Sequence, residues 1–231
     1  MTTLTVAIST VADGSMFNRH DHHDERIITN RERWLAQHHI TLDQTTRLDV
    51  NANQRDKELH ETNWCQYKEV ARTDKGHGMS GDDIFVADSI ITRDLDHALF
   101  LPVADCVGAI FYDPTNKILM LSHLGRHSLE QQGGEKSVAH LVQHYGSDPT
   151  DILVWLTPAP SKESYPIWAL DNKGMKEVMF EQLATAGIRK EHITDNPTET
   201  DKDPAYFSYS EYLQDRRAED GDHAIVAMMT A

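Results

Sequence analysis

The sequence predicts an α+β fold, a single domain over residues 1–231 with mostly antiparallel or mixed β-sheets flanked by helices. Apolar strand-like runs cluster between residues 84 and 123, and amphipathic helical patterns follow them. The chain also shows no Pro/Gly/Ser linker and no repeat of about 20 to 50 residues. With 231 residues, of which 39% are apolar, it is long enough to bury a sizeable core.

The first third of the chain predicts few regular elements. Residues 4–11 alternate apolar and polar side chains, which indicates a half-buried strand. Thr29 and Glu32 have capping-box spacing and predict a helix over about 30–39. Charged residues and glycines then predict a loop-rich insertion at about residues 43–83, with strands near 46–50 and 67–71 and a short helix across 55–63 as options.

The middle of the chain predicts a largely antiparallel sheet. Four apolar runs are separated by turn residues, at 84–92, 97–104, 107–112 and 118–123. A helix ending at Gly146, a strand at 151–156 and a second helix at 172–186 follow. The last predicted strands are at 206–209 and 224–229.

Charge and cysteine content limit the partners. Lys and Arg total 22 against 37 Asp and Glu, giving a formal charge of −15, which opposes nucleic-acid binding because that binding needs clustered positive charge. Nothing resembles a secretory signal, and no apolar run has the length of a membrane span, so we expect no membrane partner. Two cysteines do not make a disulfide scaffold, and we expect a reduced, cytoplasmic protein. The oligomeric state stays open.

Two side chains at the ends of neighbouring apolar runs are the candidate metal-binding or catalytic residues. Cys106 closes Ala104-Asp105-Cys106, and His123 opens His123-Leu124-Gly125. A thiol and an imidazole in these places predict either a soft-metal site or a Cys/His nucleophilic pair. The His20, His22 and His23 cluster lies in a polar stretch and is better interpreted as a solvated loop.

The order of the motifs resembles the laccase-domain family, formerly called multicopper polyphenol oxidase-like. The motifs that carry the resemblance are Asn30-Arg31, Ala87-Asp88 with Thr92, Ala104-Asp105-Cys106, Asp113-Pro114, His123-Leu124-Gly125, Pro158 and Phe207-Ser208-Tyr209. The better-supported members of this family are zinc-dependent purine nucleoside phosphorylases that also deaminate adenosine. The resemblance implies that Cys106 and His123 are catalytic zinc ligands and that the substrates are a nucleoside and phosphate.

The resemblance leaves the third zinc ligand open. The family uses the His of a Gln-Val-His-Gly segment, and counting from Asn30-Arg31 places it at Asn53, whereas counting back from Ala87-Asp88 places it near Cys65. His60 and His77 lie in the same stretch. We favour Cys65; the alternative is that it is a small buried residue beside Trp64.

Two departures from the family bear on phosphate. The Trp-Arg that follows the family's His-Ala-Gly is replaced by Arg126-His127, and two C-terminal arginines are replaced by Ser210 and Glu211. A phosphate site needs positive charge, so Glu211 should repel the anion. Arg126, or Arg216 with Arg217, could compensate, although these residues are better interpreted as surface charges.

Three functions follow. The leading one is a zinc-dependent enzyme on purine nucleosides, by phosphorolysis, deamination of adenosine or both. The second is a metal-free hydrolase or deamidase with Cys106 as nucleophile and His123 as base. The third is a catalytically inactive binding module of the same fold.

Overall fold

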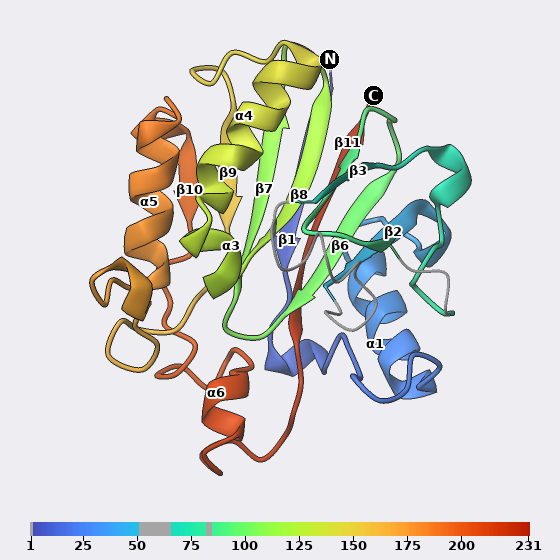
Figure 1. Cartoon of the computed structure of the whole chain (residues 1–231). Helices are drawn as coiled ribbons and strands as arrows, with labels where there is room; N and C mark the ends of the chain where they lie inside the picture. The colour runs from blue at the N-terminus through green and yellow to red at the C-terminus, as the bar shows by residue number, and fades with distance from the viewer. Residues whose placement is uncertain (1, 51–65, 82–84) are drawn as a thin grey trace.

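The computed structural model describes residues 2–50, 66–81 and 85–231. It confirms the α+β class: two mixed sheets pack face to face and helices cover their outer sides (Figure 1). The predicted helix across 55–63 lies outside the described residues. Among the helices that are described, none is long and apolar enough to cross a membrane.

The first sheet joins the two ends of the chain. Its described strands run in the order β1 (Thr3–Ile8), β11 (His223–Thr230), β6 (Ala98–Val103), β2 (Thr45–Asp49) and β4 (Phe85–Val86). β11 is antiparallel to both of its neighbours, whereas β2 is parallel to β6 and β4. This sheet therefore places residues distant in sequence side by side.

The second sheet is antiparallel at its centre and parallel at its edges. Its described strands run in the order β10 (Ile193–Asp195), β9 (Leu153–Leu156), β7 (Val107–Asp113), β8 (Ile118–Leu124), β5 (Ser89–Thr92) and β3 (Tyr67–Glu69). The β7–β8 hairpin turns at Asp113, whose carboxylate accepts hydrogen bonds from the backbone nitrogens of Thr115 (2.9 Å) and Asn116 (3.0 Å). An Asx turn of this kind fixes the register of the hairpin.

Three apolar layers hold the elements together. α1 (Glu25–Ala36) packs its Trp34 and Leu35 on Phe100 of the first sheet. Leu101 and Ile110 belong to the layer between the sheets. The outer face of the second sheet packs against three helices, α3 (Arg126–Glu130), α4 (Gly133–Tyr145) and α5 (Met175–Thr185). Every residue of β6 is buried because α1 covers one face of that strand and the second sheet covers the other.

The prediction that the four central runs form one sheet was wrong. The run at 84–92 divides into β4 and β5, which belong to different sheets, and β6 lies in the sheet opposite β7 and β8. A strand buried on both faces has no polar side to distinguish it, so the sequence pattern does not reveal its sheet.

Two local predictions also needed correction. α1 begins at Glu25 rather than near residue 30, because the Asp24 side chain caps it by accepting from the backbone nitrogen of Arg26. The strand predicted at 206–209 is absent from the described structure; the short helix α6 (Tyr209–Tyr212) begins there, capped by Ser208. Within the segment predicted to be loop-rich, the chain forms β2 and β3.

Candidate functional site

Cys106 lies where the chain crosses from the first sheet to the second. The turn between β6 and β7 places Asp105 at a φ of 73°, in the left-handed region. The Asp105 carboxylate accepts hydrogen bonds from Thr200 Oγ1 (2.8 Å) and the backbone nitrogen of Ser210 (2.7 Å). These contacts tie the turn to the C-terminal part of the chain and so fix the position of the Cys106 thiol.

His123 comes from the neighbouring strand. In the β7–β8 ladder it is the register partner of Gly108, two residues after Cys106, and its backbone nitrogen donates to the carbonyl oxygen of Asp88 at 2.7 Å. The strand pairing therefore brings the thiol and the imidazole to the same end of the sheet, as the sequence predicted for neighbouring strands.

Gly125 lies against both side chains. A Cβ atom at this position would lie 2.9 Å from His123 Cε1 and 3.0 Å from Cys106 Sγ, closer than side chains normally approach. Only glycine leaves this space open. The thiol and the imidazole therefore border one small gap, which suits two ligands of a common ion.

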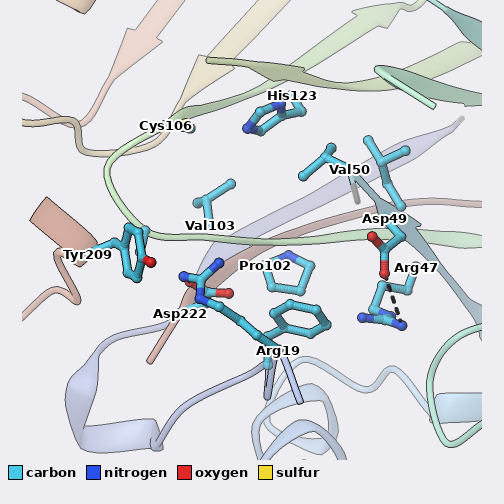
Figure 2. A pocket seen from close by; sticks show the side chains of 13 residues that line it. Arg19, Arg47, Asp49, Val50, Pro102, Val103, Cys106, His123, Tyr209 and Asp222 are labelled. Carbon is cyan, nitrogen blue, oxygen red and sulfur yellow. Dashed lines mark hydrogen bonds and ion pairs between the residues drawn. The ribbon is translucent and has the colours of Figure 1, made fainter. Parts of the chain in front are cut away.

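The pair opens into a cavity of about 260 Å³. Cys106 and His123 form one end of it, and Pro102 and Val103 of β6 lie across its middle (Figure 2). The described residues that complete the lining are Phe17, Arg19, Arg47, Leu48, Asp49, Val50, Ala104, Tyr209 and Asp222. The cavity thus joins apolar surface to a few charged groups, the usual composition of a small-molecule site.

One ion pair in the cavity joins the N-terminal and C-terminal parts of the chain. Arg19 Nη2 lies 3.0 Å from Asp222 Oδ1, and Arg19 Nε lies 3.3 Å from Asp220. The guanidinium also lies over the Tyr209 ring, 4.4 Å from its centroid. Burial raises the pKa of Asp222 to about 6, against the opposing effect of Arg19.

A second pair lies further along the cavity wall on β2. Arg47 Nη2 is 3.5 Å from Asp49 Oδ2, and both side chains are almost fully buried. The Arg47 guanidinium lies 5.0 Å from the centroid of the Phe17 ring, and burial lowers its pKa. Two opposite charges two residues apart share one face of the strand, as the alternation of side chains requires.

The sequence pattern does not single out these charged residues. Arg47 and Asp49 fall in a stretch whose composition predicts mainly loop. The available signal is that Arg47 and Asp49 carry opposite charges two residues apart, within the possible strand near 46–50. Arg19 and Asp222 are 203 residues apart, and no sequence spacing predicts their contact.

Cys106 is partly exposed as a residue and forms no disulfide with any described residue. Burial, with smaller effects from the carboxylates of Asp105 and Asp222, raises its pKa to about 12. Without a bound cation the sulfur is therefore protonated near neutral pH, and a protonated thiol is a poor nucleophile.

The predicted third ligand, Cys65, lies outside the part of the chain that the structure describes, as do His60 and Asn53. His77 stacks on the Phe85 ring, with centroids 5.6 Å apart, and is not among the residues that line the cavity. The described part of the chain contains no group of three or more His, Cys, Asp or Glu side chains arranged to hold a metal ion.

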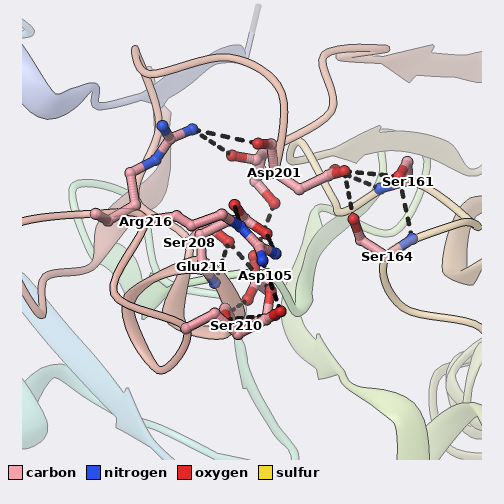
Figure 3. A network of polar contacts seen from close by, with 11 residues as sticks. Asp105, Ser161, Ser164, Asp201, Ser208, Ser210, Glu211 and Arg216 are labelled. Carbon is pink, nitrogen blue, oxygen red and sulfur yellow. Dashed lines mark hydrogen bonds and ion pairs between the residues drawn. The ribbon is translucent and has the colours of Figure 1, made fainter.

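Glu211 does not face the cavity as a free charge. Arg216 pairs with both of its carboxylate oxygens, at 2.6 and 2.5 Å, beside the network around Asp105 and Asp201 (Figure 3). Arg217 donates to backbone carbonyl oxygens of residues 200 and 201, and Arg126 lies 3.9 Å from Glu130. All three arginines therefore have local partners in the described structure.

The Asn30-Arg31 motif has a structural role. The buried Arg31 guanidinium donates to the carbonyl oxygens of Met16, Gly78 and Met79, at 2.8, 3.3 and 2.8 Å. Asn30 Nδ2 donates to the carbonyl oxygen of Ser15 at 3.0 Å. This pair attaches α1 to two loops and does not line the cavity.

Comparison with known proteins agrees with the motif order. A sequence model described as multi-copper polyphenol oxidoreductase laccase matches residues 14–230. The chain belongs to this family. It is also 29% identical to purine nucleoside phosphorylase YlmD of Bacillus subtilis (strain 168) over 102 residues, which are 43% of this chain and 37% of that protein, so the match spans well under half of the relative.

Solved structures of low sequence identity share the fold. YlmD from Geobacillus stearothermophilus has a TM-score of 0.80 at 18% identity, covering 100% of this chain and 92% of that one. The hypothetical protein YfiH from Bacillus licheniformis has a TM-score of 0.79 at 20% identity, covering 97% and 92%. NMB0706 from Neisseria meningitidis has a TM-score of 0.70 at 14% identity, covering 99% and 95%.

Proposed function

We propose that this protein is a zinc-dependent enzyme that acts on purine nucleosides, by phosphorolysis, by deamination or by both. The observation that carries the proposal is the meeting of Cys106 and His123 at Gly125 in the wall of a cavity. The family membership and the relative named purine nucleoside phosphorylase support the substrate class.

Zinc fits the donors that line this gap. Thiolate sulfur and imidazole nitrogen are common zinc ligands, and a catalytic zinc site uses three protein ligands with one position left for a reactant. Cys106 and His123 would supply two ligands, and we propose Cys65 as the third. A zinc ion bound there would supply Lewis-acid chemistry to the reaction.

The remaining lining suits a purine nucleoside. Pro102, Val103 and the Phe17 ring give the cavity flat apolar surface for a planar base. The Arg19 guanidinium and the Asp222 carboxylate offer a donor and an acceptor near the reactive pair. These groups would orient the substrate, because a few polar contacts in an apolar pocket set its direction.

The two other candidate functions make different predictions. A metal-free Cys106 nucleophile needs a readily formed thiolate, which the raised pKa of this thiol opposes. If Cys106 were such a nucleophile, its labelling by an electrophile would depend on His123. An inactive binding module would show no turnover of adenosine or inosine at any zinc level.

Metal analysis combined with turnover tests the proposal. The full chain, purified without added zinc and then reconstituted, should hold about one zinc per chain and convert adenosine or inosine. Cys106→Ser and His123→Ala should each lose the metal and the activity, and Cys65→Ser should do the same if Cys65 is the third ligand. A reconstituted protein that binds no zinc, or binds it without any turnover, would overturn the proposal.

A further inference from the structure

A row of stacked aromatic rings lies between β3 and α4, apart from the cavity. The Tyr67 ring of β3 stacks on His140 of α4, with centroids 4.3 Å apart and an angle of 14° between the ring planes. His140 stacks in turn on His144, with centroids 4.1 Å apart and an interplanar angle of 23°. None of the three lines the cavity that holds Cys106 and His123. The two imidazoles are therefore available for a separate role.

Helical spacing places both imidazoles on one face of α4. His140 and His144 are four residues apart, about one turn, so their side chains lie one above the other. His144 is exposed and His140 is half-buried, so an ion can reach the pair from solvent. Imidazole nitrogen suits zinc, copper and nickel ions. Two imidazoles held this close can bind one such ion together.

A hydrogen bond sets the tautomer of His144. Its Nδ1 lies 3.1 Å from the backbone carbonyl oxygen of His140. A carbonyl oxygen only accepts, so in the neutral ring Nδ1 carries the proton and Nε2 presents a lone pair. Histidines that bind metal ions commonly donate through their other ring nitrogen in this way, which fixes the orientation of the ring. The contact therefore prepares His144 Nε2 as a metal ligand.

His140 is held in place and kept neutral. Its ring lies between those of Tyr67 and His144, so little side-chain freedom remains to be lost when an ion binds. Burial lowers the pKa of His140 to about 4, and the neighbouring His144 acts in the same direction. The imidazole is therefore neutral near neutral pH, the form that a metal ion requires.

The surroundings of the pair favour a cation. The Tyr145 ring lies edge-on to His140, with centroids 6.0 Å apart, and its hydroxyl donates to the Glu69 carboxylate at 3.2 Å. The formal charge of −15 also attracts cations to the chain as a whole. Because the described residues include no group of three or more His, Cys, Asp or Glu side chains arranged around an ion, water would complete the coordination.

We propose that His140 and His144 bind one divalent transition-metal ion at a surface site separate from the cavity. The ligands are a ring nitrogen of His140 and Nε2 of His144. Cu²⁺ should bind more tightly than Ni²⁺ or Zn²⁺, as it does at most nitrogen sites. Because the pair has this geometry only in the folded helix, the bound ion should stabilise the fold. The proposal does not depend on the reaction in the cavity.

Nickel titration of the full chain tests the site without any need for activity. Isothermal titration of the wild type should show a saturable Ni²⁺ site, which His144→Ala should weaken at least tenfold, equivalent to about 1.4 kcal/mol. The matched control is Val142→His/His144→Ala, which keeps the number of histidines but moves the imidazole to another face of α4. It should bind Ni²⁺ as weakly as His144→Ala. The site should persist in Cys106→Ser/His123→Ala.

Thermal unfolding gives an independent measure. Excess Ni²⁺ should raise the midpoint of the wild type more than that of His144→Ala. Equal Ni²⁺ affinity in the wild type and His144→Ala, or full affinity in Val142→His/His144→Ala, would overturn the proposal. A Ni²⁺ site that is lost in folded Cys106→Ser/His123→Ala but kept in His144→Ala would place the ion at the cavity and would also overturn it. Should the cavity variant fail to fold, the two α4 variants still decide. Turnover of nucleosides bears only on the proposed function.

Discussion

Arg216 donates hydrogen bonds to both carboxylate oxygens of Glu211, with Nε–Oε2 and Nη2–Oε1 distances of 2.6 and 2.5 Å. The side chain of Glu211 is only 7% exposed, whereas that of Arg216 is half exposed. Arg216 lowers the pKa of Glu211, and Glu211 raises the pKa of Arg216. The pair is an internally neutral unit, and it joins α6 to the loop that follows it.

Removing one partner should therefore be worse than removing both. Arg216→Gln leaves the buried Glu211 carboxylate without its charged donor and should lower the thermal midpoint of unfolding. In the double variant Glu211→Gln/Arg216→Gln the unpaired charge is gone, so part of the loss should be recovered. A double-mutant cycle by differential scanning fluorimetry measures the coupling, and additive effects would argue against a working pair.

Gly125→Ala tests the gap between Cys106 and His123. The added methyl group would meet both side chains at 2.9–3.0 Å, so zinc affinity should fall by about ten- to a hundredfold while the fold is retained. Gly81→Ala is the control, because a Cβ atom there meets nothing within 4 Å. Competition with a zinc chelator gives the affinities. Equal affinities in the two variants would show that the gap at Gly125 holds no metal.

Asp105→Ala should loosen the turn that carries Cys106. The substitution removes the acceptor of the Thr200 Oγ1 and Ser210 backbone hydrogen bonds, and buried donors left unpaired cost about 1–3 kcal/mol each. Asp105→Asn keeps one acceptor oxygen and should lose less. Denaturant unfolding gives the stability, and the rate of Cys106 labelling reports the turn. An unchanged labelling rate in Asp105→Ala would show that the carboxylate does not fix the position of the thiol.

Acid should destabilise the protein through its buried histidines. Burial lowers the pKa of His97 to about 4 and that of His223 to about 3, whereas an unfolded histidine has a pKa near 6.5. The unfolded state therefore binds more protons than the folded state below pH 6.5. Each histidine should lower the free energy of unfolding by on the order of 2 kcal/mol as the pH falls towards 4. Asp222, with its pKa raised to about 6, works in the opposite direction over part of this range. Urea unfolding at pH 7.5, 6 and 4.5 measures the slope, and a stability that stays flat to pH 4.5 would contradict the prediction.

His223→Leu should make the protein more stable. His223 is fully buried, its ring packs edge-on against Tyr206, and neither ring nitrogen has a hydrogen-bond partner among the described residues. Because leucine has a similar volume and no polar atoms to desolvate, the gain should be about 1–3 kcal/mol at pH 7 and larger at pH 5. His97→Leu is the contrasting control, since His97 Nε2 lies 2.7 Å from Thr46 Oγ1 and loses that contact. A loss of stability in His223→Leu would mean that the imidazole has a favourable contact there.

The sequence by itself determined the α+β class, the family, the strands on either side of Cys106 and the strand that carries His123. Apolar periodicity is local, so β7 and β8 and the turn at Asp113 could be located from their own residues. The sequence did not separate β6 from the strands around it, because side chains buried on both faces give no alternation. The sequence pattern also misplaced the start of α1. It predicted a strand where α6 begins, because the four residues of this helix are too few to show a helical period.

Only the tertiary structure decided the charge of the site. Arg19 meets Asp222 because β1 and β11 pair the two ends of the chain, and Arg47 meets Asp49 in a strand that is buried beside β6. Glu211 was expected to repel phosphate, but its charge is matched by Arg216, and the carboxylates that face the cavity are Asp49 and Asp222. Ion pairing depends on distance across the fold and not on separation along the chain, so residue types alone could not predict which charges balance.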